Sequence, residues 1–231
     1  INNDDDNSLK KLDYAAKDAA DFVAALEKQK GILYSDIIAR SLSSGRATLS
    51  DIKQDLEWLK KEATNSDIAI VFISGHGAND PPGSTSGIYH LVPSDGFVKE
   101  LTVTSLEFST LENVLGALPS KVLVFLDSCH SGGAYLNRNI NELNEKGIVV
   151  FASSTGIQQS LEDNLWKNGA FTLALVEGLN GKADLMGDGE ITISSLDTYI
   201  SNRVGKLTGG QQIPVVTKKG IPDFSIARKK Q

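Results

Sequence analysis

Three near-continuous apolar runs divide the chain and predict strands that are buried on both faces. They are Asp67–Ile73, Lys121–Leu126 and Gly147–Ser153, each rich in β-branched or aromatic residues. Such runs are typical of a parallel sheet whose two faces are covered by helices. Shorter apolar stretches predict further strands at Ser35–Leu42, Ile88–Pro93 and Ile213–Thr217.

Between these strands, apolar residues recur at helical spacing. The first such segment, Leu9–Lys28, shows one apolar face and is followed by Gly31. Further helices are predicted from a Thr48 or Ser50 cap to Ala63, and over Ser105–Leu118, Gly169–Leu179 and Ile193–Val204. The alternation of strands and helices predicts an α/β sandwich with a mostly parallel central sheet flanked by helices. No internal repeat or linker interrupts it, so we expect a single domain over 1–231.

Composition agrees with one globular domain and narrows the function. The chain has 231 residues, of which 40% are hydrophobic and 23% charged, ordinary values for a globular protein. A net charge of −6 argues against a nucleic-acid partner, which would require a clustered positive surface. No stretch approaches the roughly 20 apolar residues that cross a bilayer, so we expect no membrane partner either.

Two of the buried strands end in a reactive side chain beside glycine. Asp67–Ile73 leads into Ser74-Gly-His76-Gly77, and Lys121–Leu126 leads into Asp127-Ser-Cys129-His-Ser-Gly-Gly133. In open α/β sheets, functional groups gather beyond the carboxyl ends of the strands. Neighbouring strands lie about 4.8 Å apart, so an imidazole and a thiol can meet there.

Such a pair is suited to thiol catalysis. A free thiol is mostly protonated at neutral pH, and an imidazole can take its proton and return it to a leaving amine. The backbone N–H groups of Gly77 and Cys129 are the natural donors to an oxyanion. Cys129 is the single cysteine of the chain, and the alternative role for it is that of a small buried hydrophobe. Positions 76 and 129 are 53 residues apart, which matches the caspase spacing of about 50.

With these residues in place, the sequence resembles the caspase-like cysteine peptidases, specifically the metacaspase and bacterial orthocaspase branch. Phe72-Ile-Ser-Gly-His-Gly77 resembles the histidine motif of that branch, and Asp127-Ser-Cys-His-Ser-Gly132 its cysteine motif. True caspases carry Gln-Ala-Cys at the second place. The likeness extends to Leu12–Ala20, to Phe151–Ser154 with Gly169–Thr172, and to Gly209–Pro214, and so covers nearly the whole chain.

The resemblance implies an endopeptidase that cleaves protein or peptide substrates after Arg, or less well Lys. It implies that Asp18 and Asp127, helped by Ser74, line the first specificity pocket, and that the enzyme works as a Cys129–His76 dyad. Two carboxylates suit a guanidinium, which they bind with charge-assisted hydrogen bonds. It also implies a large-subunit region of about 1–137 and a small-subunit region of about 147–231. Between them, Arg138 in a predicted loop is the candidate for self-cleavage, ahead of Lys146.

The resemblance also has implications for calcium binding, the oligomeric state, the cellular compartment and the first strand of the family's sheet. Asp184–Ile191 resembles half of a calcium loop, but Met186 at its third position cannot ligate a hard cation. The family's separate calcium-binding aspartates are also not found after Val98, so we expect no metal and no cofactor. A monomer is implied, and we expect it in the cytoplasm. The family opens with an apolar strand inside the sheet just before the position of Ile1, and the sequence begins at Ile1 rather than Met.

Two alternatives stay open on the sequence. Another member of the same peptidase clan, with clostripain-like or separase-like specificity, would share the two motifs. A non-catalytic caspase-like scaffold in signalling assemblies would share the fold, although inactive relatives typically lose the cysteine or the histidine, and both are present here.

Overall fold

A computed structural model describes residues 9, 12–43, 46–80, 88–131, 133–154, 161–163 and 165–229. Within these ranges, the side chains of residues 129–131 and 133–136 are not described. The longer helices are α1 (Ala15–Glu27), α2 (Leu49–Glu62), α4 (Phe108–Gly116), α5 (Gly133–Glu145), α6 (Ala170–Glu177) and α7 (Ile193–Leu207). Shorter ones are η1 (Val98–Glu100), α3 (Leu101–Thr104) and η2 (Gly178–Lys182).

Six strands form the central sheet in the order β3-β2-β1-β4-β5-β9. They are β1 (Ile68–Asn79), β2 (Tyr89–Val92), β3 (Leu106–Glu107), β4 (Lys121–Ser131), β5 (Val149–Ala152) and β9 (Val215–Thr217). The three central strands β1, β4 and β5 are parallel, while β2, β3 and β9 are added antiparallel. Most paired residues lie in the parallel ladders, so the predicted α/β sandwich is confirmed. Two small sheets, β10 (Ser225–Arg228) with β8 (Glu190–Thr192) and β6 (Glu162–Asp163) with β7 (Asn168–Gly169), lie outside it.

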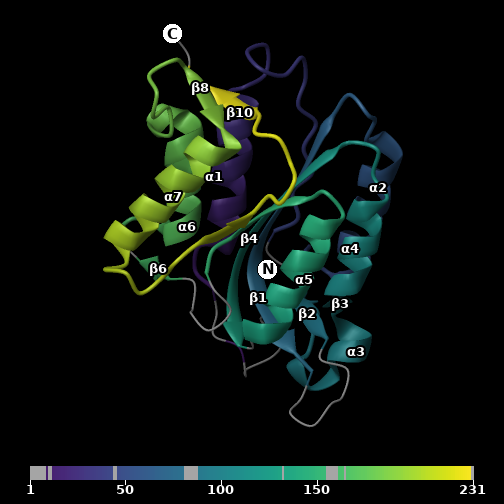
Figure 1. Cartoon of the computed structure of the whole chain (residues 1–231). Coiled ribbons are helices and arrows are strands. Elements are labelled where there is room, and N and C mark those ends of the chain that lie inside the picture. The colour runs from purple at the N-terminus through teal and green to yellow at the C-terminus, as the bar shows by residue number, and fades with distance from the viewer. Residues whose placement is uncertain are drawn as a thin grey trace.

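Helices cover both faces of the sheet (Figure 1). Helices α1, α6 and α7 pack on one face, where Phe22, Phe125 and Phe171 belong to one apolar cluster. The second cluster, with Leu56, Phe108 and Val124, lies on the other face, which α2, α4 and α5 cover. Alternate residues of β4 supply the two clusters, as expected for a strand buried on both sides.

Local signals explain several helix ends. The predicted Thr48 cap is confirmed, because its Oγ1 accepts the Asp51 N–H at 3.1 Å and satisfies a donor of the first turn of α2. A reciprocal capping box between Thr192 and Ser195 starts α7. Helix α1 begins at Ala15 rather than at Leu9, so the first predicted helix was too long at its amino end.

Two predicted segments are wrong. Ser35–Leu42 has no strand partner among the described residues and runs as irregular chain. The segment around Arg138, predicted as a loop, lies in helix α5. Its many asparagines have low helix propensity, but Ile140 and Leu143 are buried in the second apolar cluster, and this burial outweighs the propensity. In the described part of the chain, no helix combines the length and apolar character needed to cross a membrane.

Candidate active site

The two predicted catalytic residues are direct neighbours across the β1–β4 ladder. These strands pair in parallel over eleven register positions, from Ile68 opposite Lys121 to Ala78 opposite Ser131. In that register His76 stands opposite Cys129. The sheet therefore brings together two residues that are 53 positions apart in the sequence.

The same register places Ser74 opposite Asp127. Residues two apart on a strand face the same side of a sheet, so Phe72, Ser74 and His76 share one face of β1. Phe72 packs in the cluster under α1, which identifies this as the α1 face. His76 is buried on it, with 7% of its surface exposed. Cys129 follows Asp127 by two positions on β4, but its side chain lies outside the described part of the structure.

Gly77 must be glycine because Tyr89 occupies the place of a side chain. A Cβ at residue 77 would lie 1.7 Å from Tyr89 Oη. The Tyr89 hydroxyl reaches across to Ser128 Oγ at 3.3 Å, and the ring is almost fully buried. The phenol thus packs directly beneath the segment that carries His76 and Cys129, on the side of the sheet opposite α1.

Asp18 and Asp127, predicted to share a pocket, converge on Gly169. Asp18 accepts the Gly169 N–H, with N···Oδ1 and N···Oδ2 distances of 3.2 and 3.3 Å. Asp127 Oδ2 accepts the Thr172 hydroxyl at 2.7 Å. A Cβ at residue 169 would lie 2.7 Å from Asp127 Oδ2 and 3.3 Å from Asp18 Oδ2. The absence of a side chain at Gly169 therefore allows the two carboxylates to approach.

Both carboxylates of this pair are buried, and the charge of one affects the ionisation of the other. Asp18 is 1% and Asp127 5% exposed, and no lysine or arginine in the described ranges is bonded to Asp18. Burial, and then the charge of Asp127, raise the pKa of Asp18 to about 7, against the smaller opposing effect of the Asn168 and Gly169 donors. Burial and a like charge nearby both make a carboxylate costly to ionise, and a positive group placed between the two would lower that cost.

Sequence reasoning missed two polar residues of the same site. Asn168 is buried and donates from Nδ2 to Asp18 Oδ1 at 3.0 Å and to Asp21 Oδ2 at 2.8 Å. Glu162 accepts the Asp13 N–H at 3.1 Å, and burial together with the charges of Asp127 and Asp13 raises its pKa despite two backbone donors. Both come from the β6–β7 hairpin, whose sequence contains no catalytic motif. The nearest indication of their role in the sequence was the adjacent segment Gly169–Thr172, which resembles the family.

The other histidine described in full and the self-cleavage candidate have local partners. His90 is fully buried, with Nε2 3.0 Å from Asp80 Oδ1 and Nδ1 2.7 Å from Ser105 Oγ. Arg138, expected in a loop, is exposed on α5 and donates from Nε to Glu142 Oε1 at 2.8 Å. Because peptidases take their substrates as extended chain, cleavage at Arg138 would require α5 to unwind. Among the residues described, no group of three acidic, histidine or cysteine side chains could hold a metal ion.

Comparison with known proteins identifies the family. The caspase domain model of the peptidase C14 family matches residues 1–224, and the chain belongs to this family. Among solved structures, it is similar to protein GSU0716 from Geobacter sulfurreducens, with a TM-score of 0.65 and 22% identity over 92% of this chain and 86% of that one. At that identity the likeness concerns the fold. The search of curated proteins found no match.

Proposed function

We propose that this chain is a cysteine endopeptidase that cleaves after arginine, and less well after lysine. One observation carries the proposal: beside the His76–Cys129 register pair, the buried carboxylates of Asp18 and Asp127 converge on Gly169, and burial with the charge of Asp127 raises the pKa of Asp18. A guanidinium between Asp18 and Asp127 would offset their negative charges through charge-assisted hydrogen bonds. An aspartate side chain, the substrate of true caspases, would be repelled there.

The chemistry follows from the order of residues on β4. Two strand residues advance about 6.6 Å, so a substrate whose basic side chain reaches Asp127 has its carbonyl near Cys129. The Cys129 sulfur would bond to that carbonyl carbon while the peptide C–N bond breaks, and His76 would protonate the leaving amine. Backbone N–H groups of Gly77 and Cys129 would hold the oxyanion. Water then hydrolyses the acyl-enzyme and releases the new carboxyl end.

Fluorogenic peptides that differ only in the residue before the cleavage point test this proposal. We expect cleavage in the order Arg, Lys, then Ala or Asp, and loss of activity in Cys129→Ala and His76→Ala. A chloromethyl ketone bearing arginine should add one label per chain at Cys129, seen by intact mass. Folded protein that neither cleaves nor takes the label would contradict the proposal and favour a non-catalytic scaffold. Faster cleavage after Asp than after Arg would contradict the specificity alone.

A further inference from the structure

The β6–β7 hairpin contacts the amino end of helix α1 through two polar side chains. Glu162 on β6 accepts the backbone N–H groups of Asp13, at 3.1 Å, and of Tyr14. The first N–H groups of a helix have no partner inside the helix, and a carboxylate is a favourable partner for them. Asn168 on β7 bonds side chains in the first two turns of the same helix. The hairpin therefore fixes the part of α1 that carries Asp18.

The turn of this hairpin determines where Asn168 lies. Asp163 pairs with Asn168 across the hairpin, and its carbonyl accepts the Lys167 N–H at 2.8 Å. Its Oδ1 also accepts the Leu165 N–H at 2.7 Å. Lys167 has a φ of 54°, a left-handed conformation that is uncommon for residues other than glycine. Both the strand pairing and the turn thus hold Asn168, the residue that follows.

Both polar atoms of the Asn168 side-chain amide are bonded to helix α1. Nδ2 donates to Asp18 Oδ1 at 3.0 Å and to Asp21 Oδ2 at 2.8 Å, and Oδ1 accepts from Lys17 Nζ at 3.0 Å. A reversed amide would turn its acceptor toward two carboxylates and its donors toward an ammonium group. The charges on α1 therefore fix the direction of the amide.

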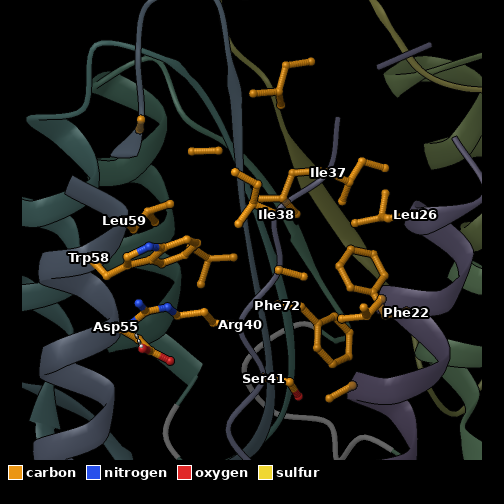
Figure 2. A pocket seen from close by; sticks show the side chains of 18 of the residues that line it. Phe22, Leu26, Ile37, Ile38, Arg40, Ser41, Asp55, Trp58, Leu59 and Phe72 are labelled. Atoms are coloured by element: carbon orange, nitrogen blue, oxygen red, sulfur yellow. Dashed lines mark hydrogen bonds and ion pairs between the residues drawn. The ribbon is translucent and has the colours of Figure 1, made fainter. Parts of the chain in front are cut away.

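Packing of α1 turns the face that carries Asp18 toward the sheet. Asp18 and Phe22 are both buried and lie four residues apart, so they share one face of the helix. Phe22 stacks on Phe72 of β1 with ring centroids 4.8 Å apart, and both rings line the cavity shown in Figure 2. This packing directs the Asp18 side chain inward. It does not set the angle of the carboxylate, because the last torsion of an aspartate is broad and roughly two-fold.

Hydrogen bonds determine which oxygen of Asp18 lies toward Asp127. The Gly169 N–H is shared by both oxygens of Asp18 and so does not distinguish them. Asn168 Nδ2 bonds Oδ1. Oδ2 lies 3.3 Å from the place that a Cβ at residue 169 would take, and Asp127 Oδ2 lies 2.7 Å from that same place. The Asn168 bond therefore accounts for the orientation that brings Oδ2 of Asp18 toward Oδ2 of Asp127.

This orientation matters most for a guanidinium group. A planar guanidinium can bond two carboxylates at once, whereas the compact ammonium of lysine acts as a point charge. We infer that Asn168 is a positioning residue, which holds the Asp18 carboxylate beside Asp127 for the guanidinium of an arginyl substrate. This inference rests on the proposed function and adds a residue that sets the preference for arginine over lysine.

The variant Asn168→Ala tests the inference through substrate preference. We expect kcat/KM for an arginyl peptide to fall about tenfold at pH 7, as for loss of a hydrogen bond to a charged group. The matched lysyl peptide should lose only about threefold, so the preference for arginine narrows. Alkylation of Cys129 by iodoacetamide should stay within about twofold of wild type. An unchanged arginine-to-lysine ratio would overturn the inference, because damage to the fold would lower both activities equally.

The pH dependence of guanidinium binding gives a second readout. The titratable groups that face Asp18 or its amide partner are Asp127 on β4, His76 on β1, Glu162 on β6, Asp13 before α1, and Lys17 and Asp21 on α1. The Asn168 bond favours the ionised form of Asp18, so its loss should raise the pKa of Asp18 further. The pH midpoint of inhibition by agmatine should therefore rise in Asn168→Ala. A midpoint equal to that of wild type would overturn the inference.

The matched control is Asn180→Ala. Asn180 accepts from Lys28 Nζ at 2.7 Å and donates to the Val176 carbonyl at 2.8 Å. It thus also bonds a lysine of α1, but Lys28 is the residue that caps the carboxyl end of that helix, away from Asp18. Asn180→Ala should leave the substrate preference and the pH midpoint unchanged. Changes equal to those in Asn168→Ala would overturn the inference.

Two further variants separate positioning from other roles of Asn168. Asn168→Leu has a side chain of similar size without the donors, so it serves if Asn168→Ala does not fold, and we expect the same narrowed preference. If Asn168 acted only by holding Lys17 away from Asp18, the double variant Asn168→Ala, Lys17→Met would regain the wild-type preference. We expect no recovery, and recovery would overturn the inference. Wild-type protein that neither cleaves arginyl peptides nor binds agmatine would instead refute the proposed function, and the inference with it.

Discussion

Two carboxylate sites in this molecule, one fully and one partly buried, are built in opposite ways. At the carboxyl end of α6, Glu177 accepts bonds from Arg203, Tyr199 and Lys182. Burial opposes its charge, but these donors lower the pKa of Glu177 to about 2. Asp18 is more deeply buried than Glu177 and has two acidic neighbours, and its pKa is raised to about 7. Glu177 is bonded to two cationic side chains, whereas Asp18 has the charge of Asp127 beside it, and this contrast supports the proposed role of Asp18 in binding a basic group.

The largest effect expected from this contrast is on specificity. Asp127→Asn keeps an acceptor for the Thr172 hydroxyl but removes the charge, so kcat/KM for arginyl substrates should fall at least 100-fold, about 2.7 kcal/mol or more. Alkylation of Cys129 by iodoacetamide, which needs no basic group, should change less than about threefold. An equal loss of arginyl cleavage and of Cys129 alkylation would show that Asp127 supports the fold and does not recognise the substrate.

A smaller effect is expected on stability at the other site. Glu177→Gln should lower the free energy of unfolding at pH 7 by about 2–3 kcal/mol, because it breaks a partly buried pair with Arg203. The lowered pKa means that this contribution is present above pH 4.5 and is lost as the pH falls toward about 2. Urea unfolding at pH 7 and pH 3 measures it. The specificity for arginine should not change in Glu177→Gln. A change in specificity would show that the Glu177 site and the Asp18 pocket are not independent.

The raised pKa of Asp18 predicts a pH-dependent pocket. Below pH 7 the carboxyl is mostly protonated and binds a cation weakly. A simple guanidinium compound such as agmatine should therefore inhibit about tenfold more strongly at pH 8 than at pH 6. Asp18→Asn should abolish this difference. Inhibition that is equally pH-dependent in Asp18→Asn would assign the titration to another group, His76 first.

The smallest effect is a gain in stability. Because the pKa of Asp18 is higher in the folded than in the unfolded chain, its ionisation costs stability increasingly as the pH rises from 3.8 to about 7. Asp18→Asn removes that cost, and we expect about 1 kcal/mol of added stability at pH 8 and none at pH 4. Thermal unfolding at both pH values measures it. Destabilisation at pH 8 would show that Asp18 is a structural acid like Glu177.

The sequence predicted the framework of the site because burial on both faces leaves a clear apolar signal. Lys121–Leu126 and Asp67–Ile73 were predicted as strands. The residues that follow them, including His76 and Cys129, continue the same pairing of β1 with β4. By contrast, Asn168 and Glu162 lie in a polar hairpin more than 30 residues after Cys129, and only the folded chain brings them to Asp18. Helix α5 was not predicted from the sequence, because the Asn and Arg residues around Ile140 and Leu143 make their helical spacing hard to recognise.

The length of the β1–β4 ladder constrains how sequences of this kind can vary. A strand that gains or loses one residue turns every later side chain to the other face of the sheet. An insertion between Ile68 and His76 would move the imidazole from the α1 face to the side of Tyr89, and one between Lys121 and Asp127 would remove the carboxylate from Asp18. Relatives should therefore differ freely in length in their loops but never within these two intervals. The number of residues in each interval is then a better guide to a working site than the identity of those residues.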